Sequence, residues 1–434
     1  MEKIAENLKT AFVWCFLPGD TAPTLSGRLT HDLGAGVATR PTFQYCESYL
    51  AHRDGMAIDP LGLPLREAPF VEMGNAGAIG AIEDALPEHW GRHVIDRAYG
   101  QQSSPVDYLL KSQQDHVGHL AFSESAEQLP EWLDPWDRSW LQDACRVVSA
   151  LDLHRPLPPE LERQLLPNTG LGGARPKITV ADGGQQFLVK FPSRRDSPEV
   201  PMARLEAAAL TLANRCGIRT VVHEVVSIAD TDLLLVRRFD RTACDGGWTR
   251  DAFLSARTLL ANGEAAQRYS FFGSYPRFAR ELGRLSARGP ADRRELFRRM
   301  VFNAVIGNGD DHDRNHGMLA DEERPDAFRL APAYDIVPAL RPPRLRQQAL
   351  GVGDLGAWST RENMLSAATS FDLDEASASA VINEVEEAAI DQWTQSCRDQ
   401  GLSAAAVSAL AACVQRIPDS HLDHNRSDLA RGHL

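Results

Sequence analysis

Apolar residues recur at helical spacing over a long stretch near position 300, and this pattern predicts a helix that leads into a polar loop. The apolar positions are Leu296, Phe297, Met300, Val301, Ala304 and Val305. They lie three or four residues apart, as one buried helix face requires. Pro290 suits the first helical turn. Asn308-Gly309 is expected to end the helix, because both residue types tolerate positive φ.

The same periodicity predicts helices elsewhere in the chain. They are expected near 87–98, 202–215, 277–285, 376–391 and 404–414. Gly217 has the place of a C-terminal cap for the helix over 202–215. Residues 103–155 read mostly as helices and loops. Three prolines within 156–159 break the chain, and a short helix is expected over 160–166.

Short apolar or alternating runs predict strands, chiefly in the first half of the chain. They fall at 11–14, 27–29, 43–45, 178–180, 186–191, 233–236 and 328–331. Tyr49-Leu50 continues the strand-like pattern, and Asp182-Gly183 is a hairpin signal. Beyond Arg241 the chain reads as helical apart from 328–331. The pattern indicates an α+β protein with a mixed N-terminal part and a mostly helical C-terminal lobe.

Length and charge narrow the class of protein. A chain of 434 residues is long enough for two or three domains. Its hydrophobic content of 43% and charged content of 24% are typical of a globular protein. The net charge of -13 argues against broad, unaided nucleic-acid binding, which needs a basic face.

Targeting signals and cysteine usage both favour the cytoplasm. The chain has no apolar run of about 18 residues, so no membrane span is expected. Its first residues lack the apolar core of a signal peptide. The seven cysteines are scattered without a Cys-x-x-Cys pair, which favours reduced thiols over a disulfide or zinc framework.

The loop 308–316 and the later run Tyr334-Asp335-Ile336 carry the most distinctive polar side chains. Asp310 and Asn315 lie in the loop, and Asp335 stands between bulky neighbours. In kinase-type phosphoryl transfer one acid receives the hydroxyl proton, while an Asn and a second Asp hold Mg²⁺.

Two other interpretations of this loop stay open. One is a solvated acidic turn, because Asn, Asp and Gly are common in turns. The other is a transition-metal site built from ligand-type side chains. Its members would be Asp310, His312, Asp313 and His316.

A glycine-rich loop over 168–177 precedes the hairpin of 178–191. Such loops let backbone amides approach phosphates, although a plain turn is an equal alternative. It is no Walker A motif, since no Gly-Lys-Ser/Thr ends it. Lys190 follows among apolar residues, where it either snorkels to solvent or pairs with an acid. Glu206, in the helix over 202–215, is the available partner, unless it is simply a solvated helix position.

In order and separation, these motifs resemble those of the HipA family of serine/threonine kinases, the toxins of bacterial toxin–antitoxin pairs. The resemblance covers nearly the whole chain. It is carried by Phe43-Gln44-Tyr45, Leu86–Arg92, Gly172–Lys177, Val189–Pro192, Arg238–Arg241, Asp310-x-His312-x-x-Asn315 and Tyr334-Asp335-Ile336. It implies a HipA-like, protein-kinase-like bilobal fold. The expected divisions are an N-terminal subdomain over 1–105, a kinase N-lobe over 106–240 and a helical C-lobe over 241–434.

The resemblance also implies roles for single residues, with ATP and Mg²⁺ as cofactors. ATP would be bound by Gly172, Gly173, Ala174, Lys177, Lys190, Glu206 and the main chain near Arg237 and Phe239. Asp310 would be the catalytic acid/base, with His312 at the transferred phosphoryl group, and Asn315 and Asp335 would bind Mg²⁺. Family members can phosphorylate a serine in their glycine-rich loop. Gly170 falls near that position here, so Thr169 is the nearest candidate for autophosphorylation.

Partners and substrate follow from the same resemblance. A HipB-like helix-turn-helix antitoxin is expected, with DNA contacted only through that partner. The protein substrate is expected among aminoacyl-tRNA synthetases or other translation proteins. The basic run 341–346 either touches substrate or is a solvated loop. Two further interpretations are a catalytically dead antitoxin-binding repressor module and a metal-dependent hydrolase.

Overall fold

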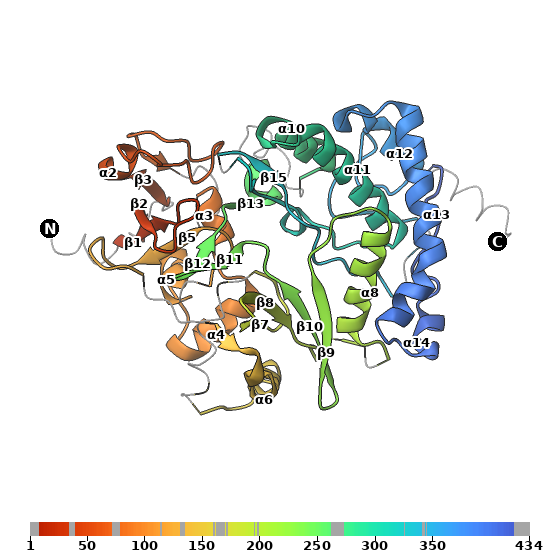
Figure 1. Cartoon of the computed structure of the whole chain (residues 1–434), viewed down its shortest axis with the longest axis horizontal. Helices are drawn as coiled ribbons and strands as arrows, with labels where there is room; N and C mark the ends of the chain where they lie inside the picture. Colours follow the sequence, from red (N-terminus) through yellow and green to blue (C-terminus); the bar gives the residue numbers. More distant parts are fainter. Residues whose placement is uncertain are drawn as a thin grey trace. The chain divides into compact units, whose positions relative to one another are not determined.

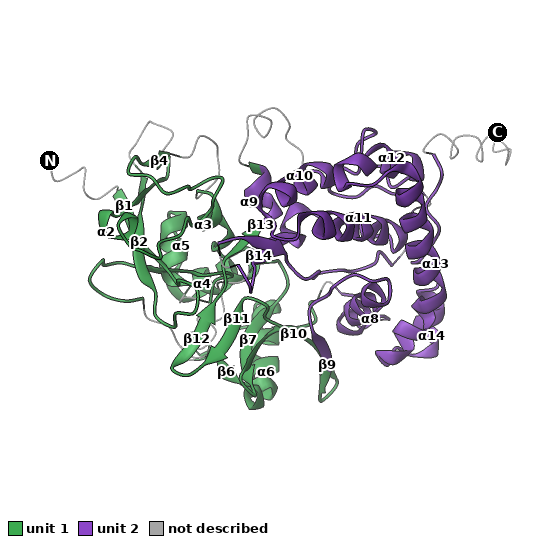
Figure 2. Ribbon diagram, turned by 45° about the horizontal axis from the view of Figure 1, so that its top comes forward, with its two compact units in different colours: residues 1–195, 226–254, 261–267 green, residues 196–225, 255–260, 268–434 purple. Residues whose placement is uncertain are grey.

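The computed structural model divides the chain into two compact units, each described here by itself. It describes residues 8–33, 40–71, 79–112, 115–130, 135–158, 161, 170, 172–194, 196–197, 199–261, 273–324, 326–340, 343 and 345–420. The first unit comprises residues 1–195, 226–254 and 261–267, and the second comprises 196–225, 255–260 and 268–434 (Figure 2).

An antiparallel sheet in the order β4-β3-β2-β1-β5 forms the N-terminal part of the first unit. Its strands are β1 (Leu8–Cys15), β2 (Thr24–Asp32), β3 (Thr42–Tyr45), β4 (Phe70–Val71) and β5 (Leu120–Ser123). The helices of this part are α2 (Glu47–Leu50), α3 (Ala81–Asp84) and α5 (Pro105–Lys111). The predicted strands at 11–14, 27–29 and 43–45 are confirmed. β5 was missed, because residues 103–155 had been read as helices and loops.

The prediction that Tyr49-Leu50 continues a strand is wrong. Both residues lie in the short helix α2. The Tyr49 ring stacks on Tyr45 with ring centroids 5.8 Å apart. Its hydroxyl donates to the Met56 carbonyl at 2.9 Å. The single helical turn therefore lets the Tyr49 ring stack and its hydroxyl form a hydrogen bond. The spacing of apolar residues in the sequence does not reveal these contacts.

A second sheet, with the order β6-β7-β8-β10-β9, lies in the first unit except for residues 223–225 of β9. Its strands are β6 (Trp136–Asp137), β7 (Lys177–Asp182), β8 (Gln185–Lys190), β9 (His223–Ile228) and β10 (Thr231–Arg237). The short helix η1 (Arg138–Trp140) precedes α6 (Leu141–Asp152), and α4 (His89–Tyr99) lies earlier in the chain. Trp90 and Val94 of α4, and Leu151 of α6, share one apolar cluster with Ile178 and Val189 of the sheet. The two helices therefore bury the apolar face of the sheet that carries the glycine-rich loop.

Two hairpins use positive-φ glycines at their turns. The predicted β7–β8 hairpin is confirmed, with Asp182 opposite Gln185. Its turn residues are Gly183-Gly184, both with positive φ, as a two-residue turn between antiparallel strands prefers. A second hairpin joins β11 (Arg241–Cys244) to β12 (Gly247–Arg250). The expectation of helix immediately beyond Arg241 is therefore wrong, and the Asp245-Gly246 turn signal had been overlooked.

The second unit is mainly helical. Its helices are α8 (Met202–Arg215), α9 (Ala256–Ala261, whose last residue falls in the first unit), α10 (Tyr275–Leu285), α11 (Gly289–Val305), α12 (Arg361–Ser366), α13 (Glu375–Asp399) and α14 (Ala404–Ala409). The short helices η4 (Asp313–Asn315) and η5 (Ala368–Phe371) also belong to this unit, and its strands β14 (Gly317–Ala320) and β15 (Phe328–Leu330) pair antiparallel. Of β13 (Phe253–Ser255), only the last residue, Ser255, falls in this unit. α13 packs along α8 and α11 (Figure 1).

The predicted helices over 202–215 and 277–285 and the helix leading to the polar loop are confirmed. α13 extends beyond the predicted end at 391, because Trp393 and Cys397 continue its buried face. α14 ends at Ala409, short of the predicted 414. The helix expected over 160–166 lies outside the described residues except for Leu161.

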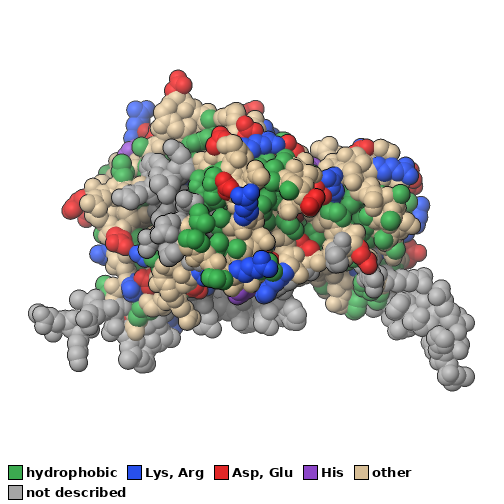
Figure 3. Space-filling model, turned by 90° about the horizontal axis from the view of Figure 1, so that it is seen from below, with side chains coloured by type: hydrophobic (Ala, Val, Ile, Leu, Met, Phe, Trp, Pro, Cys, Tyr) green, Lys and Arg blue, Asp and Glu red, His purple; other side chains and the backbone are tan. Residues whose placement is uncertain are grey.

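Two surface features bear on partners. No helix among the described residues is long and apolar enough to cross a membrane. On the face drawn in Figure 3, the basic and acidic side chains of the described residues are interspersed. That face therefore offers no broad single-sign surface among those residues.

Candidate active site

The predicted site residues fall into two groups, one in each unit. The glycine-rich loop, Lys190, Arg237 and Phe239 belong to the first unit. Glu206, the loop 308–316, which is the predicted catalytic loop, and Asp335 belong to the second. Lys190 is half-buried in β8, and Glu206 is buried in α8 at 5% exposure. Their pairing remains a prediction.

The glycine-rich loop is held from outside by residues at the start of α4. The Gly173 N–H donates to Glu88 Oε2 at 2.6 Å. The Trp90 N–H donates to the Gly173 carbonyl at 3.3 Å, and its indole donates to the Lys177 carbonyl at 2.9 Å. Glu88 takes the N-cap position of α4 but makes no side-chain cap there, so its carboxylate serves the loop instead of the helix. These anchors had no predicted role, although the sequence run 86–92 had marked their location.

Glycine is required in this loop by both conformation and space. Gly173 has a φ of +107°, which L side chains rarely adopt. A Cβ on Gly170 would lie 2.7 Å from the Asp115 carbonyl carbon and from the His116 nitrogen. The backbone therefore passes this close to its neighbours only where side chains are absent. Thr169 lies outside the described residues.

The two predicted ATP-binding lysines lie directly opposite each other on neighbouring strands. Lys177 in β7 pairs with Lys190 in β8. The Lys177 ammonium is buried and donates to the Gly172 carbonyl within the loop. Adjacent like charges across a sheet are unfavourable without compensating anions. The glycine-rich loop is therefore followed by a strand pair that places two lysines opposite each other.

The end of β10 supplies the segment predicted to meet adenine. Arg237 is exposed at the end of the strand, whereas Arg238 is buried and its N–H donates to the Gln186 carbonyl at 2.8 Å. The partly buried Phe239 packs its ring near Phe253, with centroids 5.7 Å apart. The contacts of Arg238 and Phe239 thus hold the main chain of this segment in place.

In the second unit, α11 ends in a Schellman motif just before the catalytic loop. The Gly307 N–H donates to the Ala304 carbonyl at 3.2 Å, and the Asn308 N–H donates to the Asn303 carbonyl at 2.9 Å. Gly307 carries the positive φ of 66°. The prediction that Asn308-Gly309 supplies this conformation is wrong by one residue, because the hydrogen-bond pattern places the left-handed residue directly after the C-cap.

Asp310 is exposed in the predicted catalytic loop, and its backbone carbonyl is held by hydrogen bonds from two later residues of the loop. The Asp310 carbonyl accepts from the His312 N–H at 2.9 Å and from Asn315 Nδ2 at 3.1 Å. His312 Nδ1 accepts from the Arg314 N–H at 3.2 Å and so caps η4. Asn315 is buried and uses its amide N–H within the loop. Its side-chain carbonyl oxygen is the atom suited to a hard cation.

A buried network under this loop was not predicted. The Asp311 carboxylate accepts from the Tyr275 hydroxyl and from His316 Nε2, the latter at 2.8 Å. Asn303 Nδ2 donates to the Tyr275 hydroxyl at 3.1 Å, and Asn308 Nδ2 donates to Asn303 Oδ1 at 3.2 Å. Burial and the neighbouring Asp311 raise the pKa of Tyr275 well above its usual value, so the phenol remains a donor. Both ends of the catalytic loop are thereby fixed.

Asp335 has an uncommon backbone conformation. Its φ is +55°, in the left-handed region that non-glycine residues seldom occupy. The residue is exposed, between half-buried Tyr334 and buried Ile336. The Tyr334 hydroxyl donates to the Arg314 carbonyl of the catalytic loop at 2.8 Å. Asp335 is therefore tied to the loop of Asp310 and Asn315 through its neighbour.

The alternative transition-metal site gains no support from these contacts. Two of its proposed ligands already have protein partners: His316 bonds Asp311, and Asp313 pairs with Arg257 at 3.5 Å. No group of three or more His, Cys, Asp or Glu side chains able to hold a metal occurs in the part of the chain that the structure describes.

Two family models match the chain. The HipA-like C-terminal domain matches residues 169–393, and the HipA N-terminal domain matches residues 22–123. The chain belongs to the HipA family. The C-terminal match contains the glycine-rich loop, Lys190, the catalytic loop and Asp335. The HipA-type N-terminal match contains Glu88, Trp90 and Asp115, which contact that loop or its strand.

Relatives and a solved structure agree with this assignment. The HipA-family chain is 26% identical over 364 residues to Putative kinase Y4mE of Sinorhizobium fredii, covering 77% of this chain and 82% of the relative. It is 29% identical over 166 residues to Putative kinase Y4dM of the same organism, covering 36% and 37%. The HipA of Shewanella oneidensis MR-1, solved with HipB and operator DNA, matches with a TM-score of 0.64 at 16% identity, covering 93% of this chain and 94% of that one. The α+β fold is thus HipA-like.

Proposed function

We propose that this protein is an ATP-dependent serine/threonine protein kinase and the toxin of a toxin–antitoxin pair. The observation that carries the proposal is the left-handed Asp335, exposed and tied through Tyr334 to the loop of Asp310 and Asn315. Residues in uncommon backbone conformations cluster at active sites, and this one lies next to the residue that contacts the predicted catalytic loop. Family membership and the names of the two Sinorhizobium relatives support phosphotransfer as that function.

The residues suit the proposed chemistry as follows. Asp310, exposed on the loop, would accept the proton of the attacking hydroxyl. Asn315 and Asp335 supply the oxygen ligands that Mg²⁺ prefers. Bound Mg²⁺ would neutralise the charge that develops on the transferred phosphoryl group. His312 stands two residues from Asp310, within the same bonded turn, and would contact that group.

The glycine-rich loop, its two lysines and the segment after β10 would hold the nucleotide. Lys177 and Lys190, paired across β7 and β8, supply positive charge below the glycine-rich loop. Gly172, Gly173 and Ala174 would lie along the phosphates. The main chain at Arg237 and Phe239 would meet adenine. Glu206 would orient Lys190, as a helix glutamate does in kinases.

Transfer from γ-labelled ATP tests this proposal. Purified wild-type protein should phosphorylate protein substrate in a lysate, whereas Asp310→Ala and Asp335→Ala should each lose at least about 10²-fold in rate while remaining folded. Circular dichroism and thermal melting supply the folding control. Full transfer by a clean Asp335→Ala preparation would overturn the assignment of that residue and the kinase proposal with it.

The partner and substrate complete the proposal. The Shewanella protein was solved with HipB and operator DNA, so a HipB-like antitoxin is proposed here, with DNA reached through that antitoxin. The substrate is proposed to be an aminoacyl-tRNA synthetase or another translation protein. Phosphoproteomics after induced expression, against an Asp310→Ala control, identifies it. An unchanged phosphoproteome in growth-arrested cells would instead favour a repressor or binding role.

Autophosphorylation at Thr169 remains a separate proposal. A phosphate there would repel the nucleotide phosphates and displace the loop. Mass spectrometry of active protein should find the modified peptide and should not find it in Asp310→Ala. An unmodified Thr169 in fully active protein would end this proposal without affecting the kinase assignment.

A further inference from the structure

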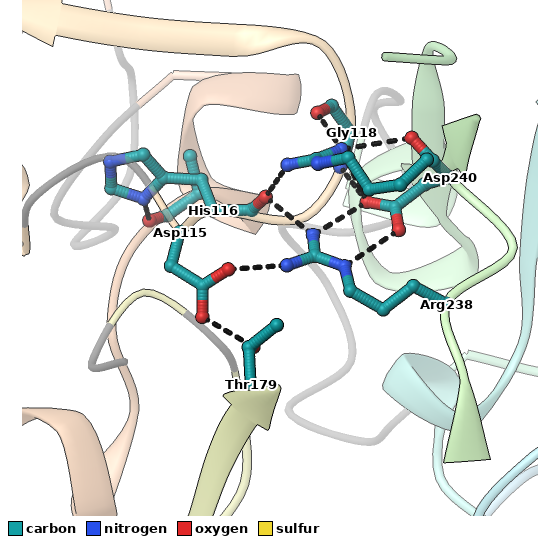
Figure 4. Close-up of polar contacts among 8 residues, drawn as sticks. Asp115, His116, Gly118, Thr179, Arg238 and Asp240 are labelled. Atoms are coloured by element: carbon teal, nitrogen blue, oxygen red, sulfur yellow. Dashed lines mark hydrogen bonds and ion pairs between the residues drawn. The ribbon is translucent and has the colours of Figure 1, made fainter. Parts of the chain in front are cut away.

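A buried cluster of charged residues lies beside the segment that follows β10. We call it the arginine hub and define it as Asp115, Arg238, Asp240 and Arg241. Figure 4 labels Asp115, Arg238 and Asp240. All of its members belong to the first unit. The side chains of Arg238, Asp240 and Arg241 are almost fully removed from solvent, and that of Asp115 is 12% exposed. None of these side chains is needed for the proposed phosphotransfer itself.

Arg238 is the centre of the hub. Its Nε and Nη2 donate to the two carboxylate oxygens of Asp240 at 3.0 and 2.9 Å. Its Nη1 donates to Asp115, and its Nη2 also donates to the His116 carbonyl at 2.9 Å. One guanidinium group thus donates hydrogen bonds to two carboxylates and a backbone carbonyl, a geometry that lysine cannot reproduce.

Arg241 and Asp240 complete the hub from the other side. Arg241 Nη1 donates to Asp240 Oδ2 and to the Gly118 carbonyl, each at 2.8 Å. The Gly118 N–H in turn donates to Asp240 Oδ2 at 2.8 Å. Burial alone would raise the pKa of Asp240, but Arg238 and Arg241 outweigh it and hold that pKa below its usual value. The ion pairs of Asp240 therefore persist at physiological pH.

The hub fixes two segments that the proposed function assigns to one nucleotide. Asp115 Oδ2 accepts from the Thr179 hydroxyl at 2.7 Å, and Thr179 lies in β7 two residues after Lys177. The backbone of Asp115 and His116 also abuts Gly170 at the start of the glycine-rich loop. On its other side, Asp115 holds Arg238, which directly precedes Phe239. Figure 4 shows the carboxylate of Asp115 between Thr179 and Arg238.

We propose that Asp115 is a positioning residue for nucleotide binding. Its carboxylate sets the separation between the strand that leaves the glycine-rich loop and the segment assigned to adenine. The inference rests on the proposed ATP site and adds a role for a residue outside the kinase-type motifs. Buried ion pairs contribute little net stability compared with apolar packing, so fixing geometry is the consequence that best accounts for this one. A misplacement of about 1 Å is enough to impair a binding constellation.

The sharpest test changes Thr179, because Thr179→Val removes one hydroxyl and leaves every ion pair in place. Thr179 is 1% exposed, so valine fills the same buried space. We expect the dissociation constant for Mg·ATP, measured by calorimetry on the full chain, to rise roughly fivefold, the effect of one lost hydrogen bond. Thr179→Ser keeps the hydroxyl and should bind within about twofold of wild type.

Ser26→Ala is the matched control for general destabilisation. Ser26 is buried in the other sheet of the same unit, and its hydroxyl donates to the Val13 carbonyl at 2.8 Å. It should lower the melting temperature about as much as Thr179→Val while leaving the affinity for Mg·ATP unchanged. Equal affinity in wild type and Thr179→Val, or equal weakening in Ser26→Ala, would overturn the positioning role.

Two outcomes separate this inference from the proposal on which it depends. Wild-type protein that binds no Mg·ATP would contradict the kinase proposal itself. Wild-type protein that binds Mg·ATP, with Thr179→Val binding equally well, would contradict only the role of Asp115. Asp115→Asn offers a second variant, because asparagine keeps the shape and an oxygen for Thr179 but removes the charge that Arg238 contacts. A folded Asp115→Asn protein should bind Mg·ATP more weakly than Thr179→Val, and equal or tighter binding would contradict the inference.

Discussion

The two groups of site residues are supported in different ways. In the first unit, the segment beyond β10 is held by the arginine hub, in which two guanidinium groups form ion pairs with two carboxylates. In the second, the predicted catalytic loop is held by one buried carboxylate, that of Asp311, which accepts hydrogen bonds from the Tyr275 hydroxyl and the His316 imidazole. Removing a carboxylate from the arginine hub is costly, because it leaves a buried guanidinium charge without its partner. Removing Asp311 leaves mainly neutral polar groups without a hydrogen bond, which costs less. Exposed functional side chains thus depend on buried neighbours of different chemistry.

The largest expected effect comes from breaking the ionic support. Asp240→Ala leaves Arg238 and Arg241 buried with one carboxylate fewer, which should lower the free energy of unfolding by about 3–5 kcal/mol. Urea denaturation followed by tryptophan fluorescence measures the change. Asp143→Ala on the exposed side of α6 is the control and should leave the midpoint nearly unchanged. A midpoint shift in Asp240→Ala no larger than that in Asp143→Ala would show that the ion pairs of the hub do not stabilise the first unit.

Breaking the hydrogen-bonded support should cost less. Asp311→Ala strands the Tyr275 hydroxyl and the His316 N–H and should destabilise the protein by roughly 2–3 kcal/mol. The adjacent Asp310→Ala, at an exposed position, should leave the melting temperature unchanged while removing transfer activity. Comparing the melting curve and rate of each variant checks both statements. Similar stability losses at positions 310 and 311 would show that the buried network does not support the loop.

A pH titration sharpens the comparison in the first unit. Burial lowers the pKa of His116, which touches the hub through its carbonyl, to about 3. The folded state keeps this ring neutral, while the unfolded chain takes up a proton below a pKa of 6.5. His116 should therefore lower the free energy of unfolding as the pH drops below about 6.5, by roughly 2 kcal/mol at pH 5. His119, whose pKa burial lowers to about 4, should add to this loss. Chemical denaturation at pH 7 and pH 5 measures this loss.

His116→Gln provides the internal comparison for that titration. Glutamine can bond the Ala85 carbonyl, which the His116 ring contacts at 2.6 Å, but it does not titrate. The variant should lose part of the acid sensitivity, even if it is less stable at pH 7. An identical pH dependence in wild type and His116→Gln would remove His116 from the account.

The smallest effect tests where α11 ends. Gly307→Ala forces a Cβ into a φ of 66° and should cost about 1 kcal/mol. Gly309→Ala, where no positive φ is required, should be nearly neutral. Thermal melting of the two variants distinguishes them. A greater loss at Gly309 would restore the sequence-based prediction of the helix end.

The sequence predicted the main elements and the exposed chemistry better than the buried supports. Helical spacing was sufficient for α8 and α11, because each has a continuous apolar face. It failed at Tyr49, where a stacked ring and a hydroxyl contact decide the local structure. Asp310, Asn315 and Asp335 were found because their types and spacing belong to a known chemistry, although their roles remain predictions.

Glu88, Asp115 and Asp311 could not be assigned from the sequence. Each acts through a partner far along the chain or through a buried contact. Glu88 contacts a loop 85 positions away, and Asp115 contacts a strand residue 64 positions away. Such pairings depend on the tertiary fold, and a single sequence carries no local pattern for them. The domain boundaries at 105 and 240 likewise remain predictions.

The most direct test of the central claim asks whether Lys190 and Asp335 serve the same bound nucleotide. An acyl-phosphate derivative of ATP transfers its acyl group to a lysine amine beside the bound phosphates, and mass spectrometry locates the modified lysine. We predict Mg²⁺-dependent labelling at Lys190 that excess ATP suppresses and that Asp335→Ala strongly reduces. Labelling of Lys190 that neither ATP nor Asp335→Ala changes would contradict the claim that Lys190 and Asp335 serve the same bound nucleotide.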